Sequence, residues 1–320
     1  MTNQTVRHVP AGGGTVEVMN RTFQERRLLR PGPEVNQAIV GILSRAVRRY
    51  RVQIVSFTVL SDHYHGILRV PDAKELAGFM CYIDSNIARE VGRIHDWDGK
   101  FWAGRYEMVL ISDEEQAQAK RLKYVLSQGV KEGFVARPEH WPGLHCASAL
   151  ISGTPTHGIW YDRTKEYNLG RSKPRRLRQT FPEHHWLAYA KLPAWSHLSD
   201  QEYQEAVQGL IDEIVVEGEA MRRAEGIVLR PLKEQQRWIC SVDPHSRPKQ
   251  SKKSTVQRFI AATREAREKM IEAYRLFVEA YRAAADELRK GNRNARFPVG
   301  CFPPGLPFVR DETGLAARSP

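Results

Sequence analysis

The sharpest local feature of the sequence is a pair of histidines, His63 and His65, on either side of Tyr64. On a β-strand, residues two apart point to the same face, so two imidazoles with roots about 7 Å apart can converge on one metal ion. The pattern is short enough to arise by chance. A strand that begins with one packed and one solvated histidine would explain the pair equally well. The histidines alone therefore do not establish a metal site.

A second feature combines a phenol with an amide. Tyr124 and Gln128 lie four residues apart in a segment of helical periodicity. Such residues share a helix face, with roots about 5–6 Å apart. The apolar residues that would anchor the other side of the helix are Leu122, Val125, Leu126 and Val130. A phenol and an amide oxygen can thus project together, although a partly buried tyrosine with a hydrogen-bonding neighbour is the ordinary alternative.

The first 150 residues alternate between strand and helix patterns. Alternation of apolar and polar residues, or β-branched and aromatic runs, predict four strands at Gly14–Phe23, Val52–Leu60, His65–Val70 and Met108–Ile111. Apolar residues at helical spacing predict two helices at Glu34–Tyr50 and Asp72–His95. A tight turn near Ser61-Asp62 joins the second and third strands, which places both histidines near a strand start.

The helix that carries Tyr124 is predicted to open with a capping box at Ser112-Asp113-Glu114-Glu115 and to run to about Gln128 or Gly129. The resulting order is β-α-β-β-α-β-α. This order predicts an α+β fold of the ferredoxin-like, split βαβ type with one added helix.

The remaining chain has a different pattern. Apolar residues at spacings of three and four predict two long helices, one over Tyr203–Met221 and one over Met270–Leu288, which we expect to pack on each other. The basic segment Arg171–Arg178 is expected to be a solvated linker or a phosphate contact, and Phe297–Val309 a proline-rich strap. We therefore divide the chain into a catalytic domain at 1–150 and a basic, mainly helical accessory region at 151–320.

Composition narrows the function classes. The chain has 320 residues, of which 41% are hydrophobic and 27% charged, a globular composition. It has no apolar run long enough to cross a membrane, and residues 1–14 lack a signal-peptide core. The four cysteines are widely separated, which excludes CxxC zinc ribbons and favours a reduced, cytoplasmic protein. Nucleotide-binding fingerprints such as GxxxxGK[ST] are absent.

The charge favours a polyanionic partner. The sequence holds 49 Lys and Arg against 37 Asp and Glu, a formal charge of +12. Residues 1–150 carry 20 basic and 16 acidic side chains, and the rest carries 29 and 21. Residues 151–320, which have no recognisable catalytic motif, therefore hold most of the excess positive charge.

The combination of these features resembles a known family, the HUH endonucleases, and specifically the single-tyrosine transposases of insertion sequences and their REP-associated relatives. The His63-Tyr64-His65 pair and the later Tyr124 and Gln128 carry the resemblance, within roughly residues 10–150. Two further segments are similar to the family, Lys100-Phe101-Trp102-Ala103-Gly104-Arg105-Tyr106 and the run from Val130 to Val135. The family mostly has an aliphatic residue where this chain has Tyr64, and its REP-associated members often have Asn in place of Gln128.

The resemblance implies a mechanism and a metal site. His63, His65 and Gln128 would hold Mg²⁺ or Mn²⁺, and Tyr124 would be the nucleophile. The metal would polarise the scissile phosphate, and attack by Tyr124 would leave a 5′-phosphotyrosine and a free 3′-hydroxyl. The expected partner is single-stranded or hairpin DNA, and the resemblance also allows a homodimer.

Several basic residues and one tryptophan are candidates for contacts with DNA. Basic side chains would meet phosphates, and unpaired bases would stack on aromatic rings. The candidates are Arg21, Arg48, Arg49, Trp102, Arg105, Lys120, Lys123 and Lys131. Most basic side chains are merely solvated, and Trp102 would equally well plug the margin of the core.

Two other functions remain open at this stage. One is a domesticated, non-catalytic protein that binds DNA or RNA hairpins. The other is a nickase of the replication-initiator type, which would use the same chemistry on a different DNA element.

Overall fold

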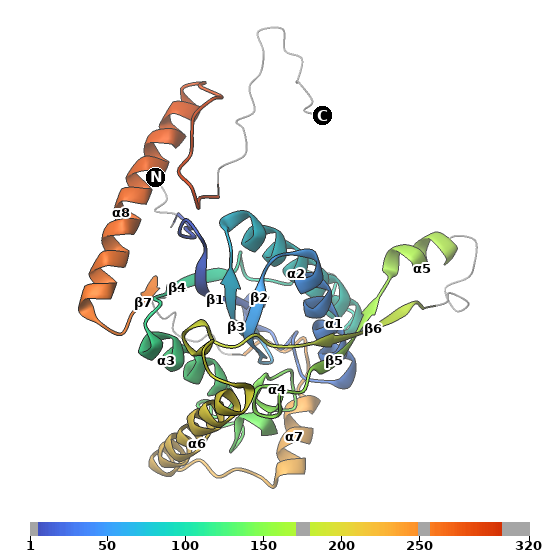
Figure 1. Cartoon of the computed structure of the whole chain (residues 1–320). Coiled ribbons are helices and arrows are strands. Elements are labelled where there is room, and N and C mark those ends of the chain that lie inside the picture. Colours follow the sequence, from blue (N-terminus) through green and yellow to red (C-terminus); the bar gives the residue numbers. More distant parts are fainter. Residues whose placement is uncertain (1–5, 171–179, 249–256, 303–320) are drawn as a thin grey trace.

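The structure is a computed structural model that describes residues 6–170, 180–248 and 257–302 (Figure 1). Its strands are β1 (Gly14–Arg21), β2 (Gln53–Val59), β3 (His63–Val70), β4 (Glu107–Ile111), β5 (Thr156–Tyr161), β6 (Pro182–Leu187) and β7 (Phe259–Ile260). Its α-helices are α1 (Pro33–Arg49), α2 (Ala73–Ile94), α3 (Glu115–Leu126), α4 (Ala147–Ser152), α5 (Arg163–Gly170), α6 (Asp200–Glu225), α7 (Leu232–Ser241) and α8 (Arg264–Arg289). Short 3₁₀ helices lie at Phe23–Glu25, Pro138–His140 and Pro193–Trp195.

The central sheet has the strand order β2-β3-β1-β4-β7. The first four of these strands pair antiparallel, and β7 pairs parallel to β4. The order of β1 to β4, with α1 and α2 between them, is that of a ferredoxin-like split βαβ unit, so the predicted α+β class is confirmed. Beyond β2, the backbone of Val59 donates to Leu144 O at 2.9 Å and Ala190 donates to Ile54 O at 2.8 Å.

Each face of the sheet has its own core. Val16, Tyr64 and Leu68 point to the face covered by α1 and α2. Ile67 and Ile111 point to the opposite face, where α3, α6 and Trp195 cover them. The alternation of side chains along β3 therefore sends Tyr64 to one core and its histidine neighbours to the other.

The β5–β6 hairpin packs on α1 through two glycines. A Cβ atom at Gly41 would lie 2.2 Å from Ile159 O, and one at Gly158 would lie 2.4 Å from Gly41 N. Only residues without a side chain allow this backbone-to-backbone approach. Part of the chain after residue 150 is thus seated directly on the helices of the first part.

The two long helices were expected to pack on each other, and this expectation is wrong. Helix α6 packs on α3 and α4, whereas α8 packs beside β7 on another side of the molecule (Figure 1). The apolar seam of α6 is buried in the core that α3 shares, with Tyr203, Val207 and Ile211 inside. The seam of α8 instead meets the N-terminal segment, where the rings of His8 and Phe277 are 4.1 Å apart. A line of apolar residues along a helix, read from the sequence, shows that the helix packs on something but does not identify what it packs on.

The predicted capping box at residues 112–115 is also wrong. Helix α3 begins at Glu115, and Ser112 Oγ donates to the Glu114 carboxylate at 2.7 Å. The same carboxylate accepts hydrogen bonds from Ala262 N at 2.7 Å and from Thr263 Oγ1 at 2.6 Å. Glu114 therefore fastens the start of α8 to the start of α3.

Some predictions lie outside the described residues, namely the basic segment Arg171–Arg178 and the tail beyond residue 302. The described part of the tail meets the N-terminal segment, where Val9 N donates to Gly300 O at 3.0 Å. All four cysteines are free thiols. Across the described ranges, every helix is too short or too polar to pass through a bilayer.

Candidate active site

The two histidines lie at the start of β3 and share one face of the sheet. Their ring centroids are 5.2 Å apart with the planes nearly perpendicular. Tyr64 between them points to the opposite core, where its hydroxyl donates to Asp84 Oδ1 at 2.7 Å. The predicted shared face of His63 and His65 is therefore confirmed.

A carboxylate holds the Nδ1 atom of each histidine. His63 Nδ1 lies 2.7 Å from Asp62 Oδ1, and His65 Nδ1 lies 2.8 Å from Glu17 Oε1. Among the described residues, no hydrogen bond involves the Nε2 atom of either ring. A carboxylate on one nitrogen fixes the tautomer and leaves the other nitrogen to ligate a metal.

The protonation states suit ligation. Burial lowers the pKa of His65 to about 4, against the opposing effect of Glu17, so this ring is neutral at pH 7. Burial works against the charged form of Asp62, but the hydrogen bond and charge of His63 and the charges of Arg27 and Arg21 outweigh it. The pKa of Asp62 is therefore lowered. A neutral imidazole is the form that binds a metal ion.

Tyr124 lies on α3, directly against the histidine pair. Its ring centroid is 5.5 Å from that of His65, with the planes at 85°. Two cations flank the same ring, because Arg121 Cζ lies 4.0 Å and Lys131 Nζ 3.9 Å from its centroid. The structure therefore brings together the phenol and both imidazoles that the sequence singled out.

Sequence reasoning missed the ion pair that connects these groups. Glu17 is fully buried in β1, and its second carboxylate oxygen accepts hydrogen bonds from the guanidinium of Arg121. Arg121 thus contacts both the carboxylate behind His65 and the ring of Tyr124. The only signal was a glutamate at an inward position of an apolar strand, which ordinarily needs a charged partner.

Gln128 lies just beyond the end of α3 and contacts the backbone of Tyr124. Its side chain is fully buried, its Nε2 donates to Tyr124 O at 2.9 Å, and its Oε1 has no hydrogen-bond partner. A buried amide oxygen without a partner is costly unless another group completes its shell. In the described part of the chain, no cluster of three or more His, Cys, Asp or Glu residues is arranged to hold a metal. A third protein ligand beside the histidines would therefore come from another residue type, and Gln128 fits.

The candidate DNA contacts divide by position. Arg21 pairs across the ladder with His63, and Lys131 lies over Tyr124, so both are at the site. Arg48 and Arg49 are the last residues of α1 and come just before the start of β2. The start of β2 pairs with Arg69 at the end of β3, and only the end of β2 pairs beside the histidines. The two arginines therefore lie at the opposite end of the sheet from the histidines.

The other candidates are engaged or exposed elsewhere. Lys123 Nζ bonds Glu213 and Glu217 of α6 at 2.7 and 2.8 Å, so it connects helices. Trp102 donates from Nε1 to Asp84 O at 2.9 Å and packs at the margin of the core. Arg105 and Lys120 are exposed.

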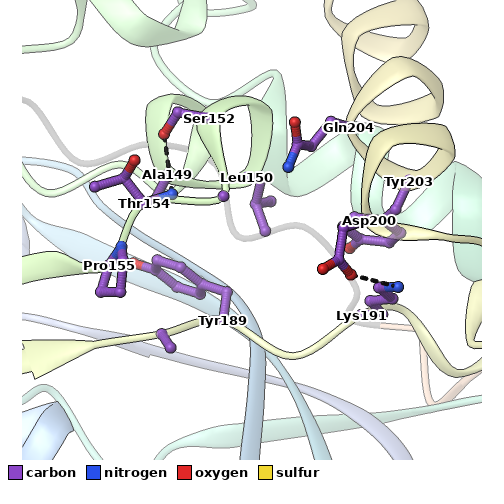
Figure 2. Close-up of a pocket in the computed structure, with 12 residues that line it drawn as sticks. Ala149, Leu150, Ser152, Thr154, Pro155, Tyr189, Lys191, Asp200, Tyr203 and Gln204 are labelled. Atoms are coloured by element: carbon purple, nitrogen blue, oxygen red, sulfur yellow. Dashed lines mark hydrogen bonds and ion pairs between the residues drawn. The ribbon is translucent and has the colours of Figure 1, made fainter.

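A polar pocket lies apart from these groups, between the end of α4 and the start of α6 (Figure 2). Lys191 and Asp200 form an ion pair of 2.7 Å on one side, and Ser152 accepts from Thr154 N on the other. None of the predicted metal ligands or the nucleophile lines it. We therefore place the candidate active site at the histidine pair.

Comparison with known proteins finds one family model that matches part of the chain. Residues 15–128 match the family model described as IS200-like transposase. Among solved structures, the chain is similar to a REP-associated tyrosine transposase bound to a REP hairpin, with 18% identity, a TM-score of 0.37, and coverage of 45% of this chain and 81% of that one. It is also similar to a protein of Deinococcus radiodurans R1 classified as a transposase, with 19% identity, a TM-score of 0.27, and coverage of 36% and 89%. No curated protein matches.

Proposed function

We propose, from the match of residues 15–128 to the IS200-like transposase family, that the chain is a metal-dependent, single-tyrosine nuclease and strand transferase that acts on single-stranded or hairpin DNA. The observation that carries the proposal is the contact of Tyr124 with His65, whose partner His63 shares its face of the sheet. The proposed nucleophile and two of the three proposed metal ligands thus lie in one cluster.

In the proposed reaction, Tyr124 Oη attacks the scissile phosphorus. A bond forms between this oxygen and phosphorus, and the bond from phosphorus to the 3′-oxygen breaks. The phenol proton passes to solvent, and the departing 3′-oxygen takes up a proton. The products are a 5′-phosphotyrosine and a 3′-hydroxyl, so a later hydroxyl can reverse the step and join strands without a nucleotide cofactor.

The residues present fit a divalent cation such as Mg²⁺ or Mn²⁺. His63 and His65 would offer Nε2, since their Nδ1 atoms are held by carboxylates, and Gln128 would offer the unpartnered Oε1. When bound, the metal polarises the phosphate and offsets the charge that develops on it. Nitrogen ligands also suit other transition metals, so the family resemblance is what favours Mg²⁺ or Mn²⁺.

The two cations at Tyr124 serve the nucleophile. Arg121 and Lys131 lie 4.0 and 3.9 Å from its ring centroid, so two positive charges lie beside the proposed nucleophile. Lys131 is exposed, so an approaching phosphate would also meet its charge. Arg121, held by Glu17, keeps the ring beside His65.

The test is to trap the covalent intermediate. Purified protein incubated with 3′-labelled single-stranded and hairpin DNA in Mn²⁺ is expected to yield a labelled protein–DNA adduct on denaturing gels, because the fragment on the 3′ side of the cleaved bond stays attached to Tyr124. Tyr124→Phe should form none, whereas Tyr167→Phe, which changes an exposed tyrosine on α5, should behave as wild type. An adduct that persists in Tyr124→Phe contradicts the assignment. Tight hairpin binding with no adduct in Mg²⁺ or Mn²⁺ would instead indicate a non-catalytic nucleic-acid-binding protein.

A further inference from the structure

An apolar pocket lies beside the histidine pair, between the loop after α3 and helix α7. Its cavity volume is about 260 Å³. The residues that line it are Arg27, Ser61, Phe134, Trp141, Trp238, Ile239, Val242, Ser246, Arg247 and Pro248. We call it the Trp238 pocket.

Three aromatic rings form one wall of the Trp238 pocket. The Phe134 centroid lies 6.0 Å from that of Trp141 and 6.4 Å from that of Trp238. Trp141 is buried, with its Nε1 donating to Val59 O at 2.8 Å, whereas Trp238 remains 40% exposed. A fixed aromatic floor and an exposed indole suit a flat, aromatic ligand.

Two guanidinium groups lie among the aromatic residues. Arg27 is partly exposed, with its Nη1 3.6 Å from Asp62 Oδ2. Arg247 is exposed and forms no ion pair with any described residue. Aromatic faces beside arginines are the combination that binds unpaired bases and their flanking phosphates.

The Trp238 pocket connects to the active site on two sides. Arg27 contacts Asp62, which holds His63 Nδ1 at 2.7 Å, and Ser61 precedes Asp62 in the chain. Phe134 N donates to Gly129 O at 2.9 Å, and Gly129 follows Gln128. A strand with a phosphate at the metal ligands would therefore have a neighbouring nucleotide within reach of the pocket.

Most of the pocket comes from outside the family match, because every lining residue except Arg27 and Ser61 lies beyond residue 128. Helix α7 and residues 242–248 lie beyond residue 128, the last residue matched. They are fastened to the catalytic part by Arg30 Nη1, which donates to Val242 O at 3.3 Å, and by His245 Nε2, which lies 2.6 Å from His95 O. The segment after α7 is thus held in place against the catalytic part.

We propose that the Trp238 pocket binds one unpaired nucleobase of the DNA substrate, stacked on Trp238 and Phe134, with a flanking phosphate at Arg247. The proposal rests on the proposed function for the position of the strand. It assigns to the second half of the chain a role in holding substrate near Tyr124.

The experiment uses two fluorescein-labelled decamers with the same number of phosphates. One is (dT)₁₀, and the other replaces every nucleotide with an abasic residue. Anisotropy titrations with the full chain should show that wild type prefers (dT)₁₀ by about tenfold or more, because a stacked base contributes that much to affinity. Trp238→Ala should lose most of this preference, and Trp238→Phe should keep part of it. Arg247→Ala should weaken both decamers by a similar factor.

The matched control is Trp186→Ala. Trp186 lies on β6 and is 62% exposed, so its loss removes an accessible indole elsewhere. Its preference for (dT)₁₀ should equal that of wild type. A Trp238→Ala protein with circular dichroism and melting temperature like wild type, and with an unchanged preference, overturns the proposal.

The two proposals fail separately. If adducts form through Tyr124 but Trp238→Ala retains the base preference, the pocket assignment is wrong and the nuclease assignment stands. If wild type forms no adduct but its base preference depends on Trp238, the nuclease assignment is wrong and the pocket assignment stands.

Discussion

The guanidinium of Arg121 lies 4.0 Å from the centroid of the Tyr124 ring and, at the same time, pairs with the fully buried carboxylate of Glu17. Glu17 in turn holds His65 Nδ1 at 2.8 Å. One side chain therefore connects the proposed nucleophile to the carboxylate that holds a proposed metal ligand. A shift in any of these groups should be transmitted to the others, because a buried ion pair tolerates little displacement.

Loss of Arg121 is expected to destabilise the fold as well as the site. Arg121→Ala leaves the Glu17 charge buried without its cation, which typically costs about 3–5 kcal/mol. We expect a lower free energy of unfolding in urea, and at least a tenfold slower adduct formation at a temperature where the variant is folded. Arg121→Lys should recover part of the stability but less of the rate, because an ammonium lacks the planar fork of a guanidinium.

The double variant Glu17→Gln/Arg121→Ala separates the two effects. Neutralising Glu17 removes the stranded charge, so this variant should be more stable than Arg121→Ala alone. Its adduct formation should remain slow, since the Tyr124 ring still lacks its guanidinium. Equal stability of the single and double variants would contradict the buried-charge explanation.

Metal binding is expected to be measurable without DNA. If Mn²⁺ binds only the folded protein, its addition stabilises the fold by about 2.7 kcal/mol at a hundred times the Kd. A thermal-shift titration should show a rise in Tm for wild type that EDTA reverses. The rise should be lost in His65→Ala and reduced in Gln128→Ala.

The control for metal binding is His157→Ala, which removes an exposed histidine of β5 that stacks on His184. Its Mn²⁺-dependent shift should equal that of wild type. A full shift in His65→Ala would show that the ion binds elsewhere.

A pH-dependent stability is expected from Asp84. Burial raises the pKa of this carboxyl to about 6, although hydrogen bonds from Tyr64 and Asn20 oppose the rise. The folded state therefore takes up a proton at a higher pH than the unfolded state, in which the carboxyl has its ordinary pKa of 3.8. The stabilising contribution is complete below the unfolded pKa and is lost as pH rises through about 6.

The measurement compares wild type with Asp84→Asn in urea at pH 8 and at pH 5. The free energy of unfolding of wild type, taken relative to that of the variant, should be larger at pH 5 than at pH 8. A difference that does not change with pH would show that Asp84 does not titrate in this range.

Docking of α8 is expected to depend on Glu114. Hydrogen bonds from Thr263 and Ser112 lower the pKa of this carboxyl to about 2, so it accepts the backbone of Ala262 and Thr263 at any ordinary pH. Glu114→Ala should speed tryptic cleavage at Arg258 and Arg264, measured by mass spectrometry of timed digests. Asp113→Ala, which changes the adjacent exposed carboxylate, should leave the cleavage rates unchanged.

Local patterns were sufficient to predict that Tyr124 lies near His63 and His65. Side chains alternate between the two faces of a strand, so residues 63 and 65 were expected on one face. Residues four apart share a helix face, so Tyr124 and Gln128 were expected near each other. Both inferences depend on spacing within single elements, which backbone geometry fixes. The β-α-β-β-α-β-α order followed from the same periodicities.

Long-range partners were not predictable in this way. The pairing of Glu17 with Arg121 joins β1 to α3, and nothing local to either residue identifies the other. The two-residue strand β7 is too short to leave a periodic signal. The seams of α6 and α8 were read correctly as buried faces, but the choice of partner depends on tertiary contacts that the spacing does not encode.

The pairing at the two margins of the central sheet has a consequence for handling the protein. β7 occupies the outer side of β4, and Ala190 occupies part of the outer side of β2. Both come from beyond residue 150, so a fragment cut there would leave backbone donors and acceptors open on both outer strands. Such strands recruit other chains, and the fragment is therefore expected to self-associate on expression where the full chain does not.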